Sequence, residues 1–182
     1  MILELSMEQN IQRVLISTEA IYKRLDELAG EILREYQGRE LTVVAVLNGS
    51  LIFAADLLRR LPLSVRLECI QASSYHGGTE SSGTVAIDQL ALPDLHGRHV
   101  LILDDILDTG LTLKVIRERI FLNATPLSLK ICVLLRKLKP REHAVPADFI
   151  GFDIGNEFVI GYGLDYQEQY RNLPYIGVFG KG

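Results

Sequence analysis

The sequence predicts one α/β domain, residues 1–182, in which a parallel β-sheet is flanked by helices. Three observations predict it. Short apolar segments rich in β-branched residues alternate with longer segments whose apolar residues recur at helical spacing. No internal repeat, low-complexity tract or linker interrupts this alternation. A chain of 182 residues is also long enough to bury roughly 70% of its unfolded surface around a single core.

The first part of the chain contains three predicted strands and two predicted helices. Thr18 is the expected N-cap of a helix that continues to about Gln37, because its apolar residues fall on one face. The other elements are a short strand over 12–17, a buried strand over 41–47, a helix after the turn at Gly49-Ser50 and a strand over 65–72.

The second part of the chain begins with a stretch that does not resemble a packed element. Residues 73–83 contain Ser, Gly and Thr with almost no large apolar side chains, so we expect a mobile loop. The elements predicted after it are a strand over 84–90, a turn over 93–97, a strand from 100, a helix over about 112–122 and a strand over 128–135.

The run VLILDDILDTGLTL, residues 100–113, is the most informative segment for function. An apolar strand ends at Asp104 and Asp105, and Thr109-Gly110-Leu111-Thr112 opens a helical pattern. The end of a parallel strand delivers side chains to a ligand crevice, and a helix N-terminus points free N–H groups at an anion. Carboxylates beside that anion suit hydroxyls, a proton or a metal, since they accept hydrogen bonds without donating them. The run therefore predicts a site for a phosphorylated sugar.

This run resembles the phosphoribosyl pyrophosphate (PRPP) motif of the type I phosphoribosyltransferases. Four further blocks accompany it in order: VAVLNGSLIFAADL (44–57), ASSYHGGTESSG (72–83), LLRKLKPR (134–141) and FVIGYGLDYQEQYRNLPYIG (158–177). With these blocks the chain resembles the hypoxanthine-guanine phosphoribosyltransferases over roughly residues 12–180. The resemblance implies the fold of that family, with a small hood built from about 1–17 and 150–182 beside the sheet.

The resemblance implies a role for each acidic residue of the PRPP run. Asp104 and Asp105 would hydrogen-bond the ribose hydroxyls of PRPP, directly or through Mg²⁺ and water. The family more often has Glu-Asp here, and the shorter first side chain should change metal contact more than chemistry. Asp108 would act as the general base at purine N7, while residues 109–112 would hold the phosphate. A solvated strand end and an ordinary helix-start residue are the alternatives.

The last two blocks match the family's base-binding positions. Lys137 would donate to O6 of a 6-oxopurine and so reject adenine, which carries a donor at that position. Phe158 would stack on the purine and Val159 would contact its edge, although a lone aromatic in an apolar strand is otherwise typical of a core. Asp165 is the remaining residue of the purine site and the expected ligand of the Mg²⁺ that holds pyrophosphate.

Pyrophosphate is expected to meet arginines and a backbone loop. Arg171, with Arg141 as a further candidate, would place a guanidinium fork on its oxygens. The loop Leu47-Asn48-Gly49 would offer backbone N–H groups, and the resemblance implies a non-proline cis peptide at its first bond. Many relatives have Lys or Arg where this chain has Asn48, so the missing cation could weaken PRPP affinity or alter subunit contacts.

The 72–83 block carries a further pair of site candidates. Ser74 and Tyr75 match the Ser-Tyr pair on the lid of the family, which excludes water from the oxocarbenium-like centre. The alternative for this stretch is an ordinary surface hairpin tip.

The composition excludes several functions. A net charge of −4 and a pI near 5.6 argue against nucleic-acid binding through a basic surface. No stretch reaches about 18 consecutive apolar residues, and the acidic N-terminus does not resemble a signal peptide, so we expect neither membrane contact nor export from the cytoplasm. Cys69 and Cys132 lie in apolar strand-like runs, which predicts buried free thiols.

The predicted activity is purine salvage with Mg²⁺ as cofactor. The enzyme would move 5-phosphoribosyl from PRPP to N9 of hypoxanthine, and of guanine as well, releasing pyrophosphate. A sister transferase that prefers xanthine or guanine is one alternative, with Glu157 as a place where the preference could lie. A regulator that binds PRPP or nucleotide without turnover is the other. Members of the family form homodimers or homotetramers, so we expect one of these assemblies.

Overall fold

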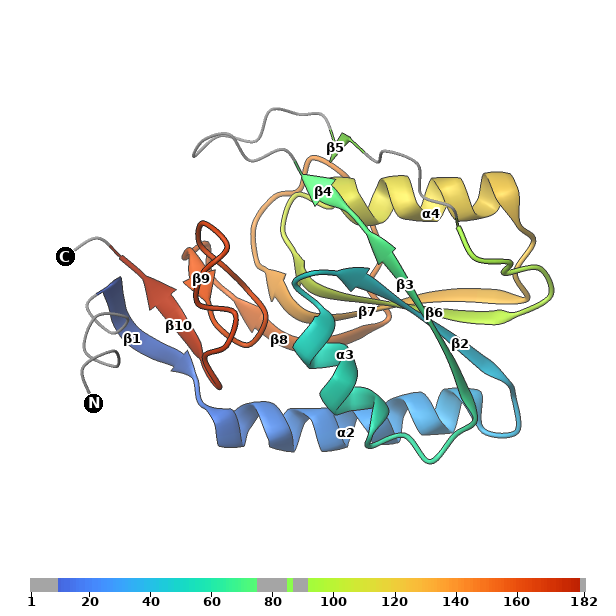
Figure 1. Cartoon of the computed structure of the whole chain (residues 1–182), viewed down its shortest axis with the longest axis horizontal. Coiled ribbons are helices and arrows are strands. Elements are labelled where there is room, and N and C mark those ends of the chain that lie inside the picture. Colours follow the sequence, from blue (N-terminus) through green and yellow to red (C-terminus); the bar gives the residue numbers. More distant parts are fainter. Residues whose placement is uncertain (1–9, 75–84, 87–91, 181–182) are drawn as a thin grey trace.

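The computed structural model describes residues 10–74, 85–86 and 92–180. Its main body is a five-stranded sheet in the order β3-β2-β6-β7-β8, and every neighbouring pair is parallel (Figure 1). The alternation of strand and helix patterns therefore predicted the sheet correctly. The strands are β2 Leu41–Leu47, β3 Val65–Gln71, β6 His99–Leu107, β7 Ser128–Lys137 and β8 Phe149–Ile154.

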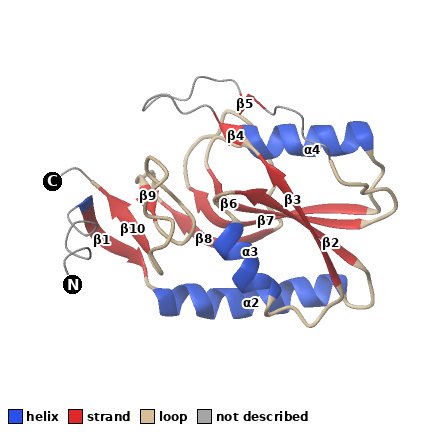
Figure 2. Cartoon of the chain, in the orientation of Figure 1, coloured by secondary structure: helices blue, strands red, loops and turns tan. Residues whose placement is uncertain are grey.

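Helices cover both faces of this sheet (Figure 2). The helices α2 (Thr18–Tyr36) and α3 (Leu51–Leu58) lie on one face, and α4 (Leu111–Asn123) lies on the other. The residues of α2 that helical spacing placed on one side are buried against the sheet. None of the helices in the described part of the chain is long and apolar enough to cross a membrane.

The N-cap of α2 is Ser17, and the prediction of Thr18 is wrong by one residue. The Ser17 hydroxyl oxygen accepts a hydrogen bond from the Ala20 N–H at 3.3 Å. Thr18 lies inside the first turn, and its hydroxyl donates instead to the carbonyl of Pro174 at 2.9 Å. Both residue types can cap a helix, so the sequence alone did not separate them.

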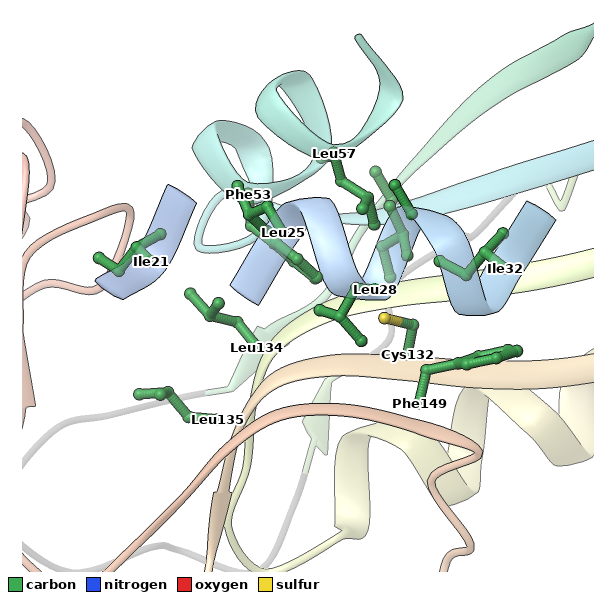
Figure 3. Close-up of a cluster of buried hydrophobic side chains, with 14 of the residues drawn as sticks. Ile21, Leu25, Leu28, Ile32, Phe53, Leu57, Cys132, Leu134, Leu135 and Phe149 are labelled. Atoms are coloured by element: carbon green, nitrogen blue, oxygen red, sulfur yellow. The ribbon is translucent and has the colours of Figure 1, made fainter. Parts of the chain in front are cut away.

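Two apolar clusters fill the space between the sheet and its helices. Figure 3 shows the first, in which Leu25 and Leu28 of α2 pack with Phe53 and Leu57 of α3 near Cys132 of β7. The second cluster joins the inner face of α4 to the opposite face of the sheet. Burial of each large apolar side chain contributes about 1.5–3 kcal/mol, so the clusters fix both helical layers on the sheet.

The two cysteines differ in environment. Cys132 is buried in the first cluster, as expected, whereas Cys69 is exposed, so the prediction of a buried thiol is wrong there. Cys69 lies on β3, the edge strand of the sheet, which pairs with β2 alone. The sequence did not show that this strand lies at the edge of the sheet with much of its surface in solvent, and the apolar residues around Cys69 suggested a buried strand instead.

A second, smaller sheet forms the hood. It consists of β1 (Ile11–Ile16), β10 (Ile176–Phe179) and β9 (Val159–Ile160), joined in that order by antiparallel pairing. Segments from the two ends of the chain thus lie side by side (Figure 1). The predicted boundary of the hood at about 150 is too early, because β8 pairs with β7 and is the edge strand of the main sheet.

Two short strands flank the segment that the sequence assigned to a mobile loop. β4 (Ser73–Ser74) pairs with β5 (Val85–Ala86) in antiparallel fashion. The intervening residues 75–84, and most of the strand predicted over 84–90, lie outside the described residues.

Candidate active site

The carboxyl ends of β2, β6 and β7 lie at one edge of the main sheet, and the loop after β2 contacts the hood there. Gly163, in the loop after β9, packs so closely on the loop after β2 that a Cβ there would lie 2.1 Å from the Gly49 carbonyl oxygen. Parallel strands end at the same edge, so residues far apart in sequence gather there. Most of the described site candidates lie on this edge or on the hood.

Asp104 and Asp105 lie inside β6, which continues to Leu107 beyond the predicted end of the strand. Asp104 is only 6% exposed. Burial raises the pKa of both carboxyl groups, and the negative charge of Asp105 raises the pKa of Asp104 further. Hydroxyl donors or a cation would stabilise this pair, and a ribose or a magnesium ion provides them.

The loop after β2 lies against this acidic pair. The Leu47–Asn48 peptide bond is cis, as the resemblance implied. A Cβ at Gly49 would lie 1.8 Å from Oδ2 of Asp105, so only glycine fits there without displacing the carboxylate. Asn48 is exposed, whereas Gly49 packs against the Asp105 side chain of β6.

Arg171 and Asp165 form an ion pair on the hood side of the same edge. Nη1 of Arg171 lies 2.9 Å from Oδ1 of Asp165 and donates to the Gly163 carbonyl at 2.9 Å. Nη2 pairs with Glu168 at 3.0 Å. The positive charge of Arg171 reaches Asp105 as well and opposes the rise of its pKa. The structure thus brings the predicted pyrophosphate arginine next to the predicted acidic residues.

The donor chemistry of this edge suits magnesium, which prefers oxygen ligands. Asp104, Asp105 and Asp165 supply carboxylates from two sides. Among the described residues, however, no three His, Cys, Asp or Glu side chains are grouped closely enough to hold a metal by themselves. Oxygens of a phosphorylated substrate would have to complete the coordination of an ion here.

The segment from Thr109 to Thr112, the predicted phosphate site, leads into a helix N-terminus, as expected. Helix α4 starts at Leu111, one residue earlier than expected, with Gly110 as its N-cap at φ +84°. A Cβ at Gly110 would lie 2.4 Å from the His143 carbonyl oxygen, so both the backbone angle and the space require glycine. Thr109 accepts a hydrogen bond from the Leu111 N–H at 3.4 Å, and Thr112 lies in the first turn.

Asp108 makes ion pairs with two lysines. Lys137, the last residue of β7, places Nζ 2.9 Å from Oδ2 of Asp108 and is 8% exposed. Nζ of Lys139 lies against Oδ1. Burial by itself raises the pKa of Asp108, but the hydrogen bonds and charges of Lys139 and Lys137 outweigh burial and lower it. Sequence reasoning missed Lys139, although a second lysine two residues after Lys137 was a signal.

Phe158 does not belong to a core. It precedes β9, is 50% exposed and makes edge contacts at 5.9 Å with the rings of Tyr166 and Phe179. Its carbonyl accepts from the Phe179 N–H, while Val159 is buried in β9. The ring is thus supported at its edges by two aromatic residues and remains accessible to a planar ligand.

Three candidates receive less support from geometry. Arg141 donates to the Lys137 carbonyl at 2.8 Å, which places it beside β7 and separate from the Arg171 cluster. Ser74 is the last residue of β4. Tyr75 lies outside the described residues.

A parallel sheet that ends in an acidic pair, a glycine-capped helix N-terminus and a facing hood is the arrangement expected of an enzyme that acts on a phosphorylated sugar. The sequence pattern of the family described as "Phosphoribosyl transferase domain" matches residues 15–167. The chain belongs to this family and, within it, to the hypoxanthine-guanine phosphoribosyltransferases, as the sequence predicted.

Individual relatives agree with this assignment. The chain is 44% identical to the hypoxanthine-guanine phosphoribosyltransferase of Streptococcus pneumoniae over 172 residues, which cover 94% of this chain and 95% of that protein. The Bacillus subtilis enzyme of the same name gives the same identity and coverage. A crystal structure of a Staphylococcus aureus hypoxanthine phosphoribosyltransferase superposes with a TM-score of 0.87 at 41% identity, covering 96% of this chain and 94% of that one.

Proposed function

We propose that the chain transfers the 5-phosphoribosyl group of PRPP to N9 of hypoxanthine or guanine, giving IMP or GMP and pyrophosphate. The shared name of its relatives supports the reaction. The ion pair between Asp108 and Lys137 is the observation that supports a 6-oxopurine as the base. N7 and O6 lie on one edge of a 6-oxopurine, and an acceptor and a donor 2.9 Å apart match that edge.

We assign the binding of PRPP to the residues at the ends of β2 and β6. Asp104 and Asp105 accept hydrogen bonds from the ribose hydroxyls. The N-terminus of α4, from Gly110 to Thr112, binds the 5′-phosphate through free N–H groups and the helix dipole. Arg171 and the backbone of the Asn48 loop bind pyrophosphate.

Mg²⁺, when bound, neutralises charge on the pyrophosphate leaving group. Asp165, Asp104 and Asp105 are the residues that would hold it, together with substrate oxygens. The fit rests on their all-oxygen chemistry and on the raised pKa of the buried pair, which a cation would reverse.

On the base side, Phe158 stacks on the purine while Lys137 donates to O6. As the C1′–O bond to pyrophosphate breaks with its electron pair, the N9 lone pair forms the new bond to C1′. The N7 proton passes to the Asp108 carboxylate, and the electrons of the N7–H bond stay in the ring. Ser74, the last residue of β4, and Tyr75, which follows it in the sequence, are proposed to close over the centre and exclude water.

Pyrophosphate release tests the function. The purified chain is mixed with Mg²⁺ and PRPP, and hypoxanthine, guanine, xanthine, adenine and uracil are added in separate reactions. We expect turnover with hypoxanthine and guanine and none with adenine or uracil. A preference for xanthine would indicate the sister specificity. Silence with every base, with PRPP or nucleotide still bound, would indicate a regulator.

We also propose that the enzyme acts in the cytoplasm as a homodimer or homotetramer and binds neither nucleic acid nor membrane. Its acidic net charge of −4 supports the absence of nucleic-acid binding. Sedimentation equilibrium tests the assembly: a monomer at micromolar concentration would contradict it.

A further inference from the structure

The carboxylate of Asp108 is bound by a different lysine at each of its oxygens. Lys137 contacts Oδ2 from the last position of β7. Lys139 contacts Oδ1 from the loop that follows β7. The Lys137 side chain is well shielded, with 10% of it exposed, while the side chains of Asp108 and Lys139 are half-buried. What sets this group apart is that a separate cation lies at each oxygen of one carboxylate.

The two lysines bind different acceptors once a purine is present. In the proposed function Lys137 donates to O6 of the base, and this takes its ammonium group away from Oδ2 of Asp108. Oδ2 then faces the N7–H of the purine. Of the two lysines, only Lys139 still binds the carboxylate, and it does so at the oxygen that the base does not use.

We propose that Lys139 is a positioning residue for the transfer: it holds Oδ1 of Asp108 so that Oδ2 stays aimed at purine N7 while Lys137 bonds O6. This inference rests on the proposed function. A carboxylate at the start of a helix has several rotamers, and an ion pair at one oxygen selects among them. Lys139 thereby acts on the reaction without touching the substrate.

The charges around Asp108 support the same conclusion. Besides the two lysines, Arg141 approaches through the Lys137 carbonyl, and His143 packs on the loop through its N–H to the Thr109 carbonyl at 3.2 Å. The lysines lower the pKa of Asp108 against the effect of burial. The carboxylate is therefore ionised and able to accept when the base arrives, and removal of Lys139 raises its pKa.

The test compares single variants of the full chain in steady-state IMP formation. Lys139→Met removes the ion pair and keeps the length of the side chain. We expect kcat to fall about 10- to 100-fold, within the range of a misplaced general base, while KM for PRPP changes less than about twofold. Lys139→Arg should restore kcat to within about fivefold, because a guanidinium also binds Oδ1. The acid limb of the kcat profile should move to higher pH in Lys139→Met.

A matched control is Lys114→Met, since Lys114 is an exposed lysine of α4 whose ion pair with Glu118 spans 4.0 Å. It should keep wild-type kcat. If Lys139→Met does not fold by circular dichroism, Lys139→Gln carries the same test. Wild-type kcat without the Lys139 charge, a fall matched in Lys114→Met, or an equal rise in KM for PRPP overturns the inference. A wild-type chain without transferase activity overturns the proposed function instead.

Discussion

The proposed phosphate side of the site, Asp104 to Thr112, comes from one continuous run in β6 and the start of α4. The base side is assembled differently. Lys137 ends β7, Phe158 precedes β9, and the rings that support Phe158 come from Tyr166 and from Phe179 of β10. The comparison shows that neighbouring residues of one strand–helix segment are positioned by that segment alone. A site built from distant segments depends instead on how the hood is placed on the sheet.

Asp108 connects the two sides, since it belongs to the phosphate run but binds Lys137 of the base side. Asp108→Asn should lower kcat about 10²–10⁴-fold, because an amide cannot take the N7 proton. Steady-state IMP formation measures this. Asp153→Asn is the control: it removes a carboxylate of an exposed ion pair with Arg136 and should leave kcat unchanged. A nearly intact kcat in Asp108→Asn would refute the assignment of the base.

The hood packs on the loop after β2 through a close contact between two glycines, Gly163 and Gly49, which we call the joint. Gly163 has φ +102°, and a Cβ there would lie 2.1 Å from the Gly49 carbonyl oxygen. Gly163→Ala should lower the free energy of unfolding by about 2–4 kcal/mol, since strain and overlap add. Gly38→Ala is the control, because Gly38 has φ +75° with open space around it and should cost about 1–2 kcal/mol. If urea denaturation gave the same loss of unfolding free energy for Gly163→Ala and Gly38→Ala, the close contact between Gly163 and Gly49 would not contribute to stability.

This contrast explains how much of the molecule was predictable. Strand and helix order followed from periodicity, because each element buries one recognisable face. The placement of the acidic pair shortly before the start of α4 followed too, since strand and helix start are adjacent in sequence, whereas the phosphate-binding role of this run stays a prediction. The cis bond at Leu47–Asn48 and the base-side candidates came from resemblance, because no local pattern specifies them.

What the sequence did not reveal depends on contacts between distant elements. Phe179, 21 positions after Phe158, supports that ring only because β10 pairs with β9. Lys139 forms its ion pair with Asp108 only because β6 and β7 are neighbours in the sheet. The ion pair of Arg13 with Glu157, at 3.0 Å, likewise depends on assembly of the hood.

The proposed role of Phe158 is confined to the base side, so this residue tests whether the two sides are separable. Phe158→Ala should raise KM for hypoxanthine about 5- to 100-fold, the loss expected when about 1–3 kcal/mol of stacking is removed. KM for PRPP should stay within about twofold. Phe121→Ala, at a 53% exposed ring on α4, is the matched control and should change neither constant. An equal rise in both constants for Phe158→Ala would mean that the two sides are not separable.

The smallest expected effect belongs to the loop after β2, on the phosphate side. Asn48 is exposed there, next to the glycine that packs on Asp105. Asn48→Lys adds a cation beside the proposed pyrophosphate position. An exposed ion pair contributes about 0.2–1 kcal/mol, so KM for PRPP should fall at most about fivefold, and less at high salt.

Asn48→Gln separates charge from side-chain length and should leave KM for PRPP unchanged. KM for hypoxanthine should not change in either variant, because the loop belongs to the phosphate side. An unchanged KM for PRPP in Asn48→Lys would mean that the backbone of this loop, rather than its side-chain charge, accounts for pyrophosphate binding. The missing cation would then matter, if at all, for contacts between subunits, and the dissociation constant of the oligomer is the quantity that would show it.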